Sequence, residues 1–348
     1  MTSRSFVAML IWMTLSVQGV LFSACSENET LSTPDKVYVN VLFTPESFCN
    51  MGYNDITLKA IETLSHKYGY EYSFCVPESI EEGMSYYTDW CLTEVDDVSR
   101  SLFVFASNLY DEPLANAPHP TDDPRKDILM FEVARELPYA YTFAMTYYGA
   151  SYMIGSFYLK HTPADFHIIA ANPYLKGLDE VVDGFSAATE ETKIGTVSVE
   201  YISESADGGL DDDDKAFYLC KVADLTGDDD AQIFIPFAGL SNLGVYRFSQ
   251  SNHQLAVGVD CIDPNSFSHI KLCMNKRMDL ALDDFLELWM NGDNAPRHRF
   301  YTLDSGRVVV ERATIFNSYS EELDSLYNRA VAVEREYFQK RGVDEAYL

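Results

Sequence analysis

The sequence has few basic residues and, beyond its first 25 positions, no long hydrophobic run. Its 348 residues include 25 Lys and Arg against 54 Asp and Glu, which gives a formal net charge of −29 at pH 7. A charge of this sign repels phosphate backbones and anionic lipid headgroups, so we expect no nucleic-acid partner. After residue 25, no apolar run approaches the ~20 residues that a membrane-spanning helix needs.

The motifs of several common catalytic and metal sites are also missing. The sequence holds no GxSxG, HExxH or P-loop motif, no CxxC and no Cys/His cluster with zinc spacing. The acidic runs at 207–215 and 226–230 lack the ligand spacing of an EF-hand, and the first suits the N-terminus of a helix at 215–225. We expect no catalytic residue, no metal and no cofactor, although a paired-carboxylate hydrolase leaves no local signature and stays open.

The chain instead has abundant apolar residues arranged as alternating strands and helices. Its apolar content of 47% and its length are enough for two domains, each with a core. Alternation of this kind predicts an α/β fold with parallel sheets, and a cleft between two lobes as the natural ligand site. The predicted strands cover 37–44, 70–76, 102–106, 139–145, 166–171, 196–201, 233–239 and 255–260. The predicted helices cover 58–68, a segment ending at Arg135, 149–160, 178–185, 276–289 and a tail from about 321.

Two predicted strands end in residues that suit a binding site. IFIPFAG ends in Gly239 and LAVGVD ends in Asp260, with a loop expected from 261 to the next helix. In open α/β sheets, ligands collect at the carboxyl ends of the strands, so a carboxylate at this place is positioned to meet a polar group. The alternatives are an ordinary loop role for Asp260 and a purely conformational role for Gly239.

The N-terminus predicts export. Arg4 precedes an apolar run from 6 to 22, and the small residues Ser23 and Ala24 lead into Cys25. This arrangement resembles a bacterial lipoprotein cleavage site, which implies a signal peptide at 1–24, lipidation of Cys25 and a tether at 25–36. We expect a protein of the bacterial cell envelope, on its periplasmic face or outer surface, with membrane contact through the lipid alone. The alternative is an ordinary signal peptide.

Six further cysteines leave the question of disulfides open. An exported protein permits disulfides, but six cysteines allow 15 connectivities, and small buried thiols are an equally good reading. The six are Cys49, Cys75, Cys91, Cys220, Cys261 and Cys273.

Several segments together resemble the basic membrane protein family, the lipoprotein solute-binding proteins similar to purine nucleoside receptors of ABC importers. They are GYNDITLKAIETL, GASYMIGSFYL, HIIAANPYLKGLDEVVDGF, IFIPFAGLSNLGVY, VGVD and NKRMDLAL, in the family's order and spacing from Val37 to about Val310. The resemblance implies a type I periplasmic-binding fold of two Rossmann-like lobes joined by a three-crossing hinge. It places lobe 1 at 37–145 plus 256–296 and lobe 2 at 146–255 plus 297–348, with crossings near Met145, Leu255 and Arg297.

The resemblance also implies the residues of a nucleoside site. Asp260 and Lys276 match the family's acid and lysine that hold the ribose, and Gly239 matches the glycine that lets the backbone approach the sugar. A carboxylate and an ammonium suit a pair of hydroxyl groups, because one accepts and the other donates hydrogen bonds. A solvated surface role is the alternative for Lys276.

Other positions would contact the base. Asn54 and Asp55 match the polar pair after the first strand, although Asp55 could instead cap the following helix. Leu58 stands where family members carry a stacking phenylalanine, and offers an apolar wall. Asn108 and Tyr174 lie in the corresponding cleft loops.

These residues predict a lipid-anchored receptor that captures a small polar ligand such as a nucleoside for ABC-type uptake, with an ABC permease as partner. Such a site recognises its ligand and breaks no bond, so we expect no enzyme. The alternative is a surface-exposed lipoprotein scaffold that keeps the fold but has lost the pocket, which Leu58 and the acidic tether favour.

Overall fold

The computed structural model describes residues 36–45, 52–95, 99–120, 123–206, 208–227, 230–260 and 263–343. The chain divides into Met1–Lys36 and Val37–Leu348, and the fold described below is that of the second unit, including Lys36 as the first residue of its opening strand. The predicted signal peptide, Cys25 and all of the tether before Lys36 lie outside the described residues.

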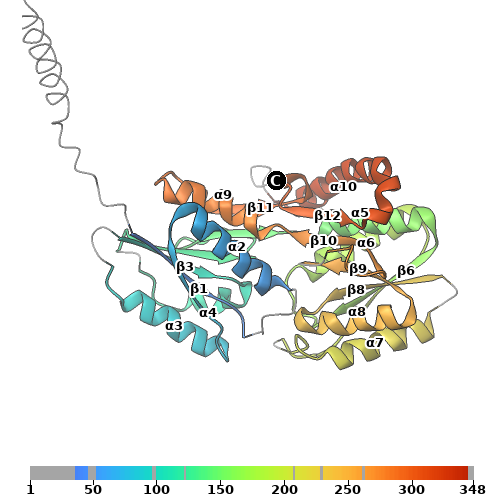
Figure 1. Ribbon diagram of the computed structural model, residues 1–348, viewed down its shortest axis with the longest axis horizontal. Coiled ribbons are helices and arrows are strands. Elements are labelled where there is room, and N and C mark those ends of the chain that lie inside the picture. Colours follow the sequence, from blue (N-terminus) through green and yellow to red (C-terminus); the bar gives the residue numbers. More distant parts are fainter. Residues whose placement is uncertain are drawn as a thin grey trace, which may run out of the picture. The chain divides into compact units, whose positions relative to one another are not determined.

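One six-stranded sheet in the described residues has the order β11-β5-β4-β3-β1-β2. Its strands are β1 (Lys36–Leu42), β2 (Glu71–Cys75), β3 (Ser99–Phe105), β4 (Lys126–Phe131), β5 (Tyr141–Met145) and β11 (His298–Tyr301). The pairs β1–β2, β3–β4, β4–β5 and β5–β11 are parallel. Figure 1 shows α2 (Tyr53–Tyr68) and α9 (Met278–Met290) on one face of this sheet and α3 (Ile80–Leu92) on the other; α4 (Asp111–Ala115) is a short helix after β3.

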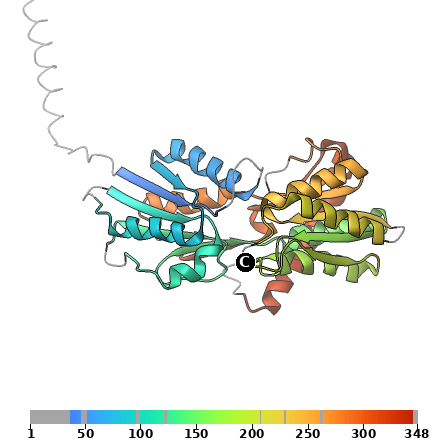
Figure 2. The ribbon, with the colours of Figure 1, turned by 90° about the horizontal axis from the view of Figure 1, so that it is seen from below.

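A second six-stranded sheet has the order β12-β10-β9-β8-β6-β7. Its strands are β6 (Ala164–Ala170), β7 (Val197–Tyr201), β8 (Ala231–Phe237), β9 (Leu255–Val259), β10 (Ile270–Lys276) and β12 (Val308–Arg312). Only the β10–β12 pair among those described in this sheet is antiparallel. The helices α5 (Tyr148–His161) and α6 (Leu178–Thr192) cover one face, and α7 (Asp213–Thr226) and α8 (Asn242–Asn252) lie side by side on the other (Figure 2).

Local sequence explains where several of these elements begin and end. Helix α2 stops at Gly69, which adopts the left-handed conformation that glycine takes without a steric penalty. Helix α7 begins after Asp212, whose side chain accepts a hydrogen bond from the Lys215 backbone N–H at 2.9 Å. The prediction that the acidic run at 207–215 caps a helix is therefore confirmed.

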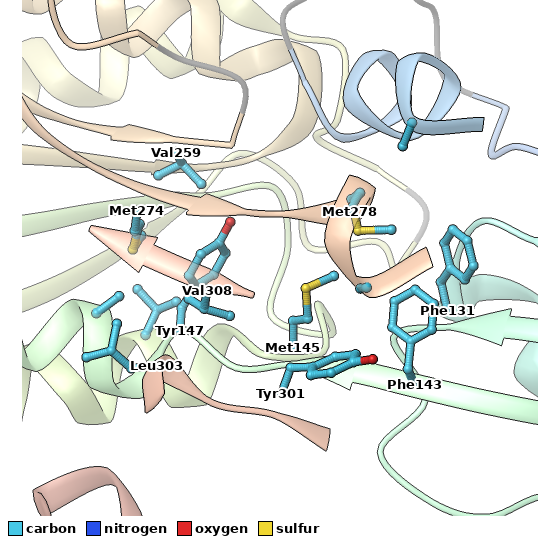
Figure 3. Close-up of a cluster of buried hydrophobic side chains, with 14 of the residues drawn as sticks. Phe131, Phe143, Met145, Tyr147, Val259, Met274, Met278, Tyr301, Leu303 and Val308 are labelled. Carbon is cyan, nitrogen blue, oxygen red and sulfur yellow. The ribbon is translucent and has the colours of Figure 1, made fainter. Parts of the chain in front are cut away.

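Three described segments connect the two lobes. The chain first crosses between β5 and α5, next at Arg277 between β10 and α9, and finally between β11 and β12. The C-terminal helix α10 (Ser320–Lys340) packs on α5. Figure 3 shows apolar side chains of these crossing segments packed together, among them Met145, Tyr147, Tyr301 and Leu303. Two parallel-sheet lobes joined by three crossings confirm the predicted fold class.

Two strands belong to a different lobe from the one that the resemblance implied. LAVGVD was expected to complete the first lobe, but β9 pairs with β8 and β10 in the second sheet. β11, expected in the second lobe, pairs with β5 in the first. The crossing predicted near Leu255 therefore falls at Arg277, and the one predicted near Arg297 falls after β11. The lobe boundaries need revision at these strands and otherwise stay a prediction.

Two predictions of local structure were also wrong. The segment ending at Arg135 is not helical over 126–131, where β4 forms, and the expected loop after 260 contains β10. Both segments carry short apolar runs, ILMF in β4 and LCM in β10, that are buried in the structure. Periodicity in so short a run does not distinguish a buried strand from a piece of helix, so only the pairing with neighbouring strands decides.

The four described cysteines form no disulfide, and two of them, Cys220 and Cys273, are buried while the other two are half-buried. Cys75, Cys91, Cys220 and Cys273 are all free, while Cys49 and Cys261 lie outside the described residues. Within the part of the chain that the structure describes, no helix is both long and apolar enough to cross a membrane.

Candidate functional site

A cavity of about 180 Å³ lies between the two lobes, where strands of both sheets end. It is lined by residues from the ends of β1, β3, β4, β8, β9 and β10 and from the start of α2. Five of the eight ligand-binding residues predicted from the sequence line it together: Asn54, Asn108, Gly239, Asp260 and Lys276. Residues more than 200 positions apart are thus assembled around one space.

The other three predicted residues do not line this cavity. Asp55 lies in the first turn of α2, which begins at Tyr53, so it is not the N-cap residue that we considered as an alternative. Leu58 packs against the hydrophobic core. Tyr174 is 65% exposed, and its neighbour Leu175 lines the cavity in its place.

Asp260 and Lys276 come together because their strands are neighbours in the second sheet. β9 and β10 run parallel, with Val259 opposite Met274, and the Asp260 backbone N–H donates to the Met274 carbonyl at 3.0 Å. The carboxyl ends of the two strands therefore share one edge of the sheet, and both side chains line the same cavity.

Glu132, at the end of β4, forms an ion pair with the Lys276 ammonium across the cleft. Lys276 Nζ donates to Glu132 Oε1 at 2.8 Å, and the two side chains are 12% and 15% exposed. The Tyr53 hydroxyl donates to the same oxygen at 3.2 Å, and the Met145 backbone N–H donates to Glu132 Oε2 at 3.3 Å. This ion pair links the first sheet to the second inside the site.

Tyrosine side chains complete the surroundings of the ammonium and of Asp260. Lys276 Nζ lies 4.8 Å from the Tyr147 ring centroid and 5.7 Å from that of Tyr53, which gives cation–π contacts. The Tyr147 hydroxyl donates a hydrogen bond to Asp260 Oδ1. Burial raises the pKa of Tyr147 and of Tyr53 well above the usual value, and the nearby carboxylates Glu132 and Asp260 add to this, so both phenols stay protonated donors.

The charges inside the site are only partly balanced. Burial raises the pKa of Asp260, against the opposing effects of Lys276 and of the Tyr147 hydrogen bond. Burial alone would lower the pKa of Lys276, but Glu132 and Asp260 raise it above the usual value, so the lysine stays charged. The ammonium of Lys276 is therefore the counter-charge of two carboxyl groups, those of Glu132 and Asp260.

Both carboxyl residues have a backbone conformation that is unusual outside glycine. Glu132 has φ 59° and Asp260 has φ 57°, each directly after the end of a strand. The left-handed region costs a non-glycine residue roughly 1 kcal/mol, and such strain gathers at functional sites. The hydrogen bonds to their side chains hold both residues in place. Gly239 also lies in this region, at φ 56°, where glycine has no penalty.

A second cavity, of about 340 Å³, adjoins the first and shares Asn108, Glu132, Tyr147, Lys176, Phe237 and Lys276 with it. At its edge, Asp111 of the first lobe binds Arg135 at 2.6 Å and Lys176 of the second lobe at 3.3 Å. Glu180, in the first turn of α6, also lines it. Burial raises the pKa of Glu180 to about 7, although a hydrogen bond with the Thr146 side chain opposes the shift.

These groups suit the recognition of a small polar molecule. The site offers carboxylate acceptors, an ammonium donor, the Asn54 and Asn108 amides and aromatic walls, and it lies between the two lobes. Among the described residues, no group of three or more His, Cys, Asp or Glu side chains could hold a metal ion.

Sequence reasoning missed Glu132, Tyr147, Glu180, Lys176 and Phe237 as lining residues. Glu132 was not predicted because β4, the strand directly before it, was interpreted as part of a helix. Phe237 and Lys176 do lie within IFIPFAG and NPYLKG, the segments singled out, but one residue or more away from the positions that the resemblance indicated. Glu180 also lies within a quoted segment, HIIAANPYLKGLDEVVDGF, but neither Glu180 nor Tyr147 was singled out, because their importance depends on which helix end and which crossing face the cleft.

Comparison with known proteins supports the fold and leaves the family open. No protein-family model and no curated protein sequence matches the chain significantly. Among solved structures, an ABC transporter solute-binding protein from Aeropyrum pernix is 14% identical, with a TM-score of 0.66 over 86% of each chain. One from Conexibacter woesei is 14% identical, with a TM-score of 0.62 over 86% of this chain and 97% of the other.

Regulators share this architecture as well. A LacI family transcriptional regulator from Enterococcus faecium, with bound ribose, is 13% identical, with a TM-score of 0.53 over 79% of this chain and 97% of the other. The structure is therefore a type I periplasmic-binding-protein-like fold of two α/β lobes. At these identities the likeness shows the fold alone, and function has to be argued from the site.

Proposed function

We propose that the protein is an extracytoplasmic receptor that captures a small hydroxylated solute, such as a nucleoside, in the cleft between its lobes. The observation that carries the proposal is the cavity lined by Asp260, Lys276, Asn54 and Asn108, since the chain brings these distant polar residues to one place. The finer parts of the proposal, which are a lipid anchor at Cys25 and an ABC permease as partner, rest on the N-terminal sequence and on the resemblance to the basic membrane protein family.

In this proposal, Asp260 and Lys276 hold neighbouring hydroxyl groups of the ligand. Asp260 accepts hydrogen bonds and the ammonium of Lys276 donates them, which is the complementarity that a diol requires. Asn54 and Asn108 meet a second polar edge of the ligand, and Tyr53 or Phe237 provides an apolar face. Closure of the lobes about the three crossings then removes water from these contacts.

Isothermal titration calorimetry of the full chain tests the proposal. The probes are adenosine, inosine, guanosine, uridine and cytidine, together with ribose, glucose and galactose. We expect at least one probe to bind, and Asp260→Asn to weaken it about tenfold or more, because a charged acceptor is lost. Asp89→Asn, an exposed position on α3, is the matched control and should bind like the unchanged chain. Absence of binding by every probe would remove the claim of a hydroxylated ligand.

A scaffold without a ligand is the weaker proposal. It requires a cleft filled by side chains, whereas two adjoining cavities remain between the lobes and the strained residues Glu132 and Asp260 line them. A DNA-binding regulator also fits poorly, because the net charge of −29 repels a phosphate backbone.

A further inference from the structure

We infer that the 340 Å³ cavity is a subsite for a basic amine, so that the captured solute carries an ammonium group beside its hydroxyls. This inference rests on the proposed function, because it assigns a second part of the same ligand to the space next to Asp260 and Lys276. The ammonium would lie against Glu180, and the rest of the ligand would extend into the smaller cavity.

The charged residues around the larger cavity are paired with one exception. Asp111 binds Arg135 and Lys176, Glu132 binds Lys276, and Asp179 binds Arg341 at 3.1 Å. Glu180 has no ion-pair partner among the described residues; its side-chain contact is the hydroxyl of Thr146. It is also half-buried, in the first turn of α6. The cavity is therefore lined by one carboxyl group whose charge the chain itself does not neutralise.

Negative charge is also in excess when the carboxyl groups of the two cavities are counted together. Arg135 and Lys176 bind Asp111, which leaves Lys276 as the cation shared by Glu132, Asp260 and Glu180, and its hydrogen bond goes to Glu132. A buried carboxylate without a cation is unfavourable, because it loses its hydration and gains no partner. A ligand ammonium placed at Glu180 would supply the missing charge.

The walls of the cavity suit an ammonium as well. Tyr147, Phe237 and Phe300 line it and offer aromatic faces or edges near the acidic group. The three cations that line the same cavity, Arg135, Lys176 and Lys276, are already engaged by Asp111 and Glu132. The subsite is therefore expected to favour aminated solutes.

Matched pairs of probes test the inference by calorimetry on the full chain. The pairs are glucosamine with glucose and 5′-amino-5′-deoxyadenosine with adenosine, which differ by one basic amine. We expect the amine of a pair to bind about tenfold tighter or more, and Glu180→Gln to remove this preference. Glu190→Gln, exposed on the same helix, is the control and should keep the preference.

Proton release provides a second readout that a merely structural role would not produce. Glu180 has a pKa of about 7, in the field of Asp179, Glu132, Glu334 and Lys276, so it is about half protonated at pH 7. A bound ammonium favours its ionised form, and roughly half a proton per site should leave. Titrations in phosphate and MOPS buffers, which differ in ionisation enthalpy, measure this release, which should vanish in Glu180→Gln.

The outcomes separate the two proposals. If the neutral probes bind as tightly as their amines, or if Glu180→Gln keeps the preference, the amine subsite is overturned and the receptor proposal stands. If neither member of any pair binds, and no probe of the wider panel does either, the receptor proposal fails and this inference fails with it.

Discussion

Glu334 should make the stability of the fold depend on pH in the range from about 4.5 to 7. This residue of α10 is 1% exposed, and its carboxyl oxygens accept hydrogen bonds from the backbone N–H of Gly149 at 2.9 Å and of Leu303 at 2.8 Å. The two N–H groups belong to the segments of the first and third crossings, so one side chain ties two parts of the hinge. Burial raises the pKa of Glu334 from 4.5 to about 7, against the effect of the two hydrogen bonds.

The sign follows from the direction of this shift. Because the folded pKa lies above the unfolded value, the folded chain holds the proton more tightly, and the resulting stabilisation is fully present below pH 4.5. It is lost as the pH rises through about 7, and the loss amounts to roughly 3 kcal/mol of unfolding free energy. Glu334→Gln cannot titrate, so its stability should lack this decline. It should also show a constant loss of about 1 kcal/mol, because an amide nitrogen cannot accept one of the two hydrogen bonds.

Urea unfolding followed by circular dichroism at pH 4.5, 5.5, 6.5 and 7.5 measures this difference. Other titrating groups are present in both proteins and cancel in the comparison, apart from Glu180, whose charge acts on Glu334. Glu321→Gln is the matched control, since Glu321 is exposed on the same helix. We expect the control to parallel the unchanged chain. If the profile of Glu334→Gln is parallel as well, the buried carboxyl does not titrate as its surroundings imply, and the reasoning is refuted.

Two further perturbations test the site and a helix cap. Lys276→Met and Glu132→Gln should each lower the unfolding free energy by about 3 kcal/mol, because each leaves the partner's charge or polar group buried. The unfolding free energy of the double variant should fall by clearly less than the sum of the two single losses. Additive losses in chemical denaturation would show that the pair is not coupled across the cleft. Asp212→Ala should lower stability by about 1 kcal/mol by removing the N-cap of α7, whereas Asp211→Ala should not. Equal thermal shifts for the two aspartate variants would contradict the capping role.

Part of the fold could be predicted because it depends on local patterns. Strands such as 233–239 and helices such as 149–160 are visible as apolar runs and helical spacing, and their alternation implies parallel sheets. Asp260 and Lys276 could be placed at strand ends for the same reason. The structure brings both to one cavity, while their role in binding a ligand stays a prediction.

The sequence by itself determined the two-lobed α/β class, the acidic surface and the carboxylate at the end of a late strand. Only the tertiary structure decided which sheet each late strand joins, since neither LAVGV in β9 nor HRFY in β11 records the neighbours to which the strand hydrogen-bonds. It also decided the partners inside the cleft. Glu132 meets Lys276 from 144 positions away, and such a contact depends on how the two lobes fold and cross, which no local pattern records.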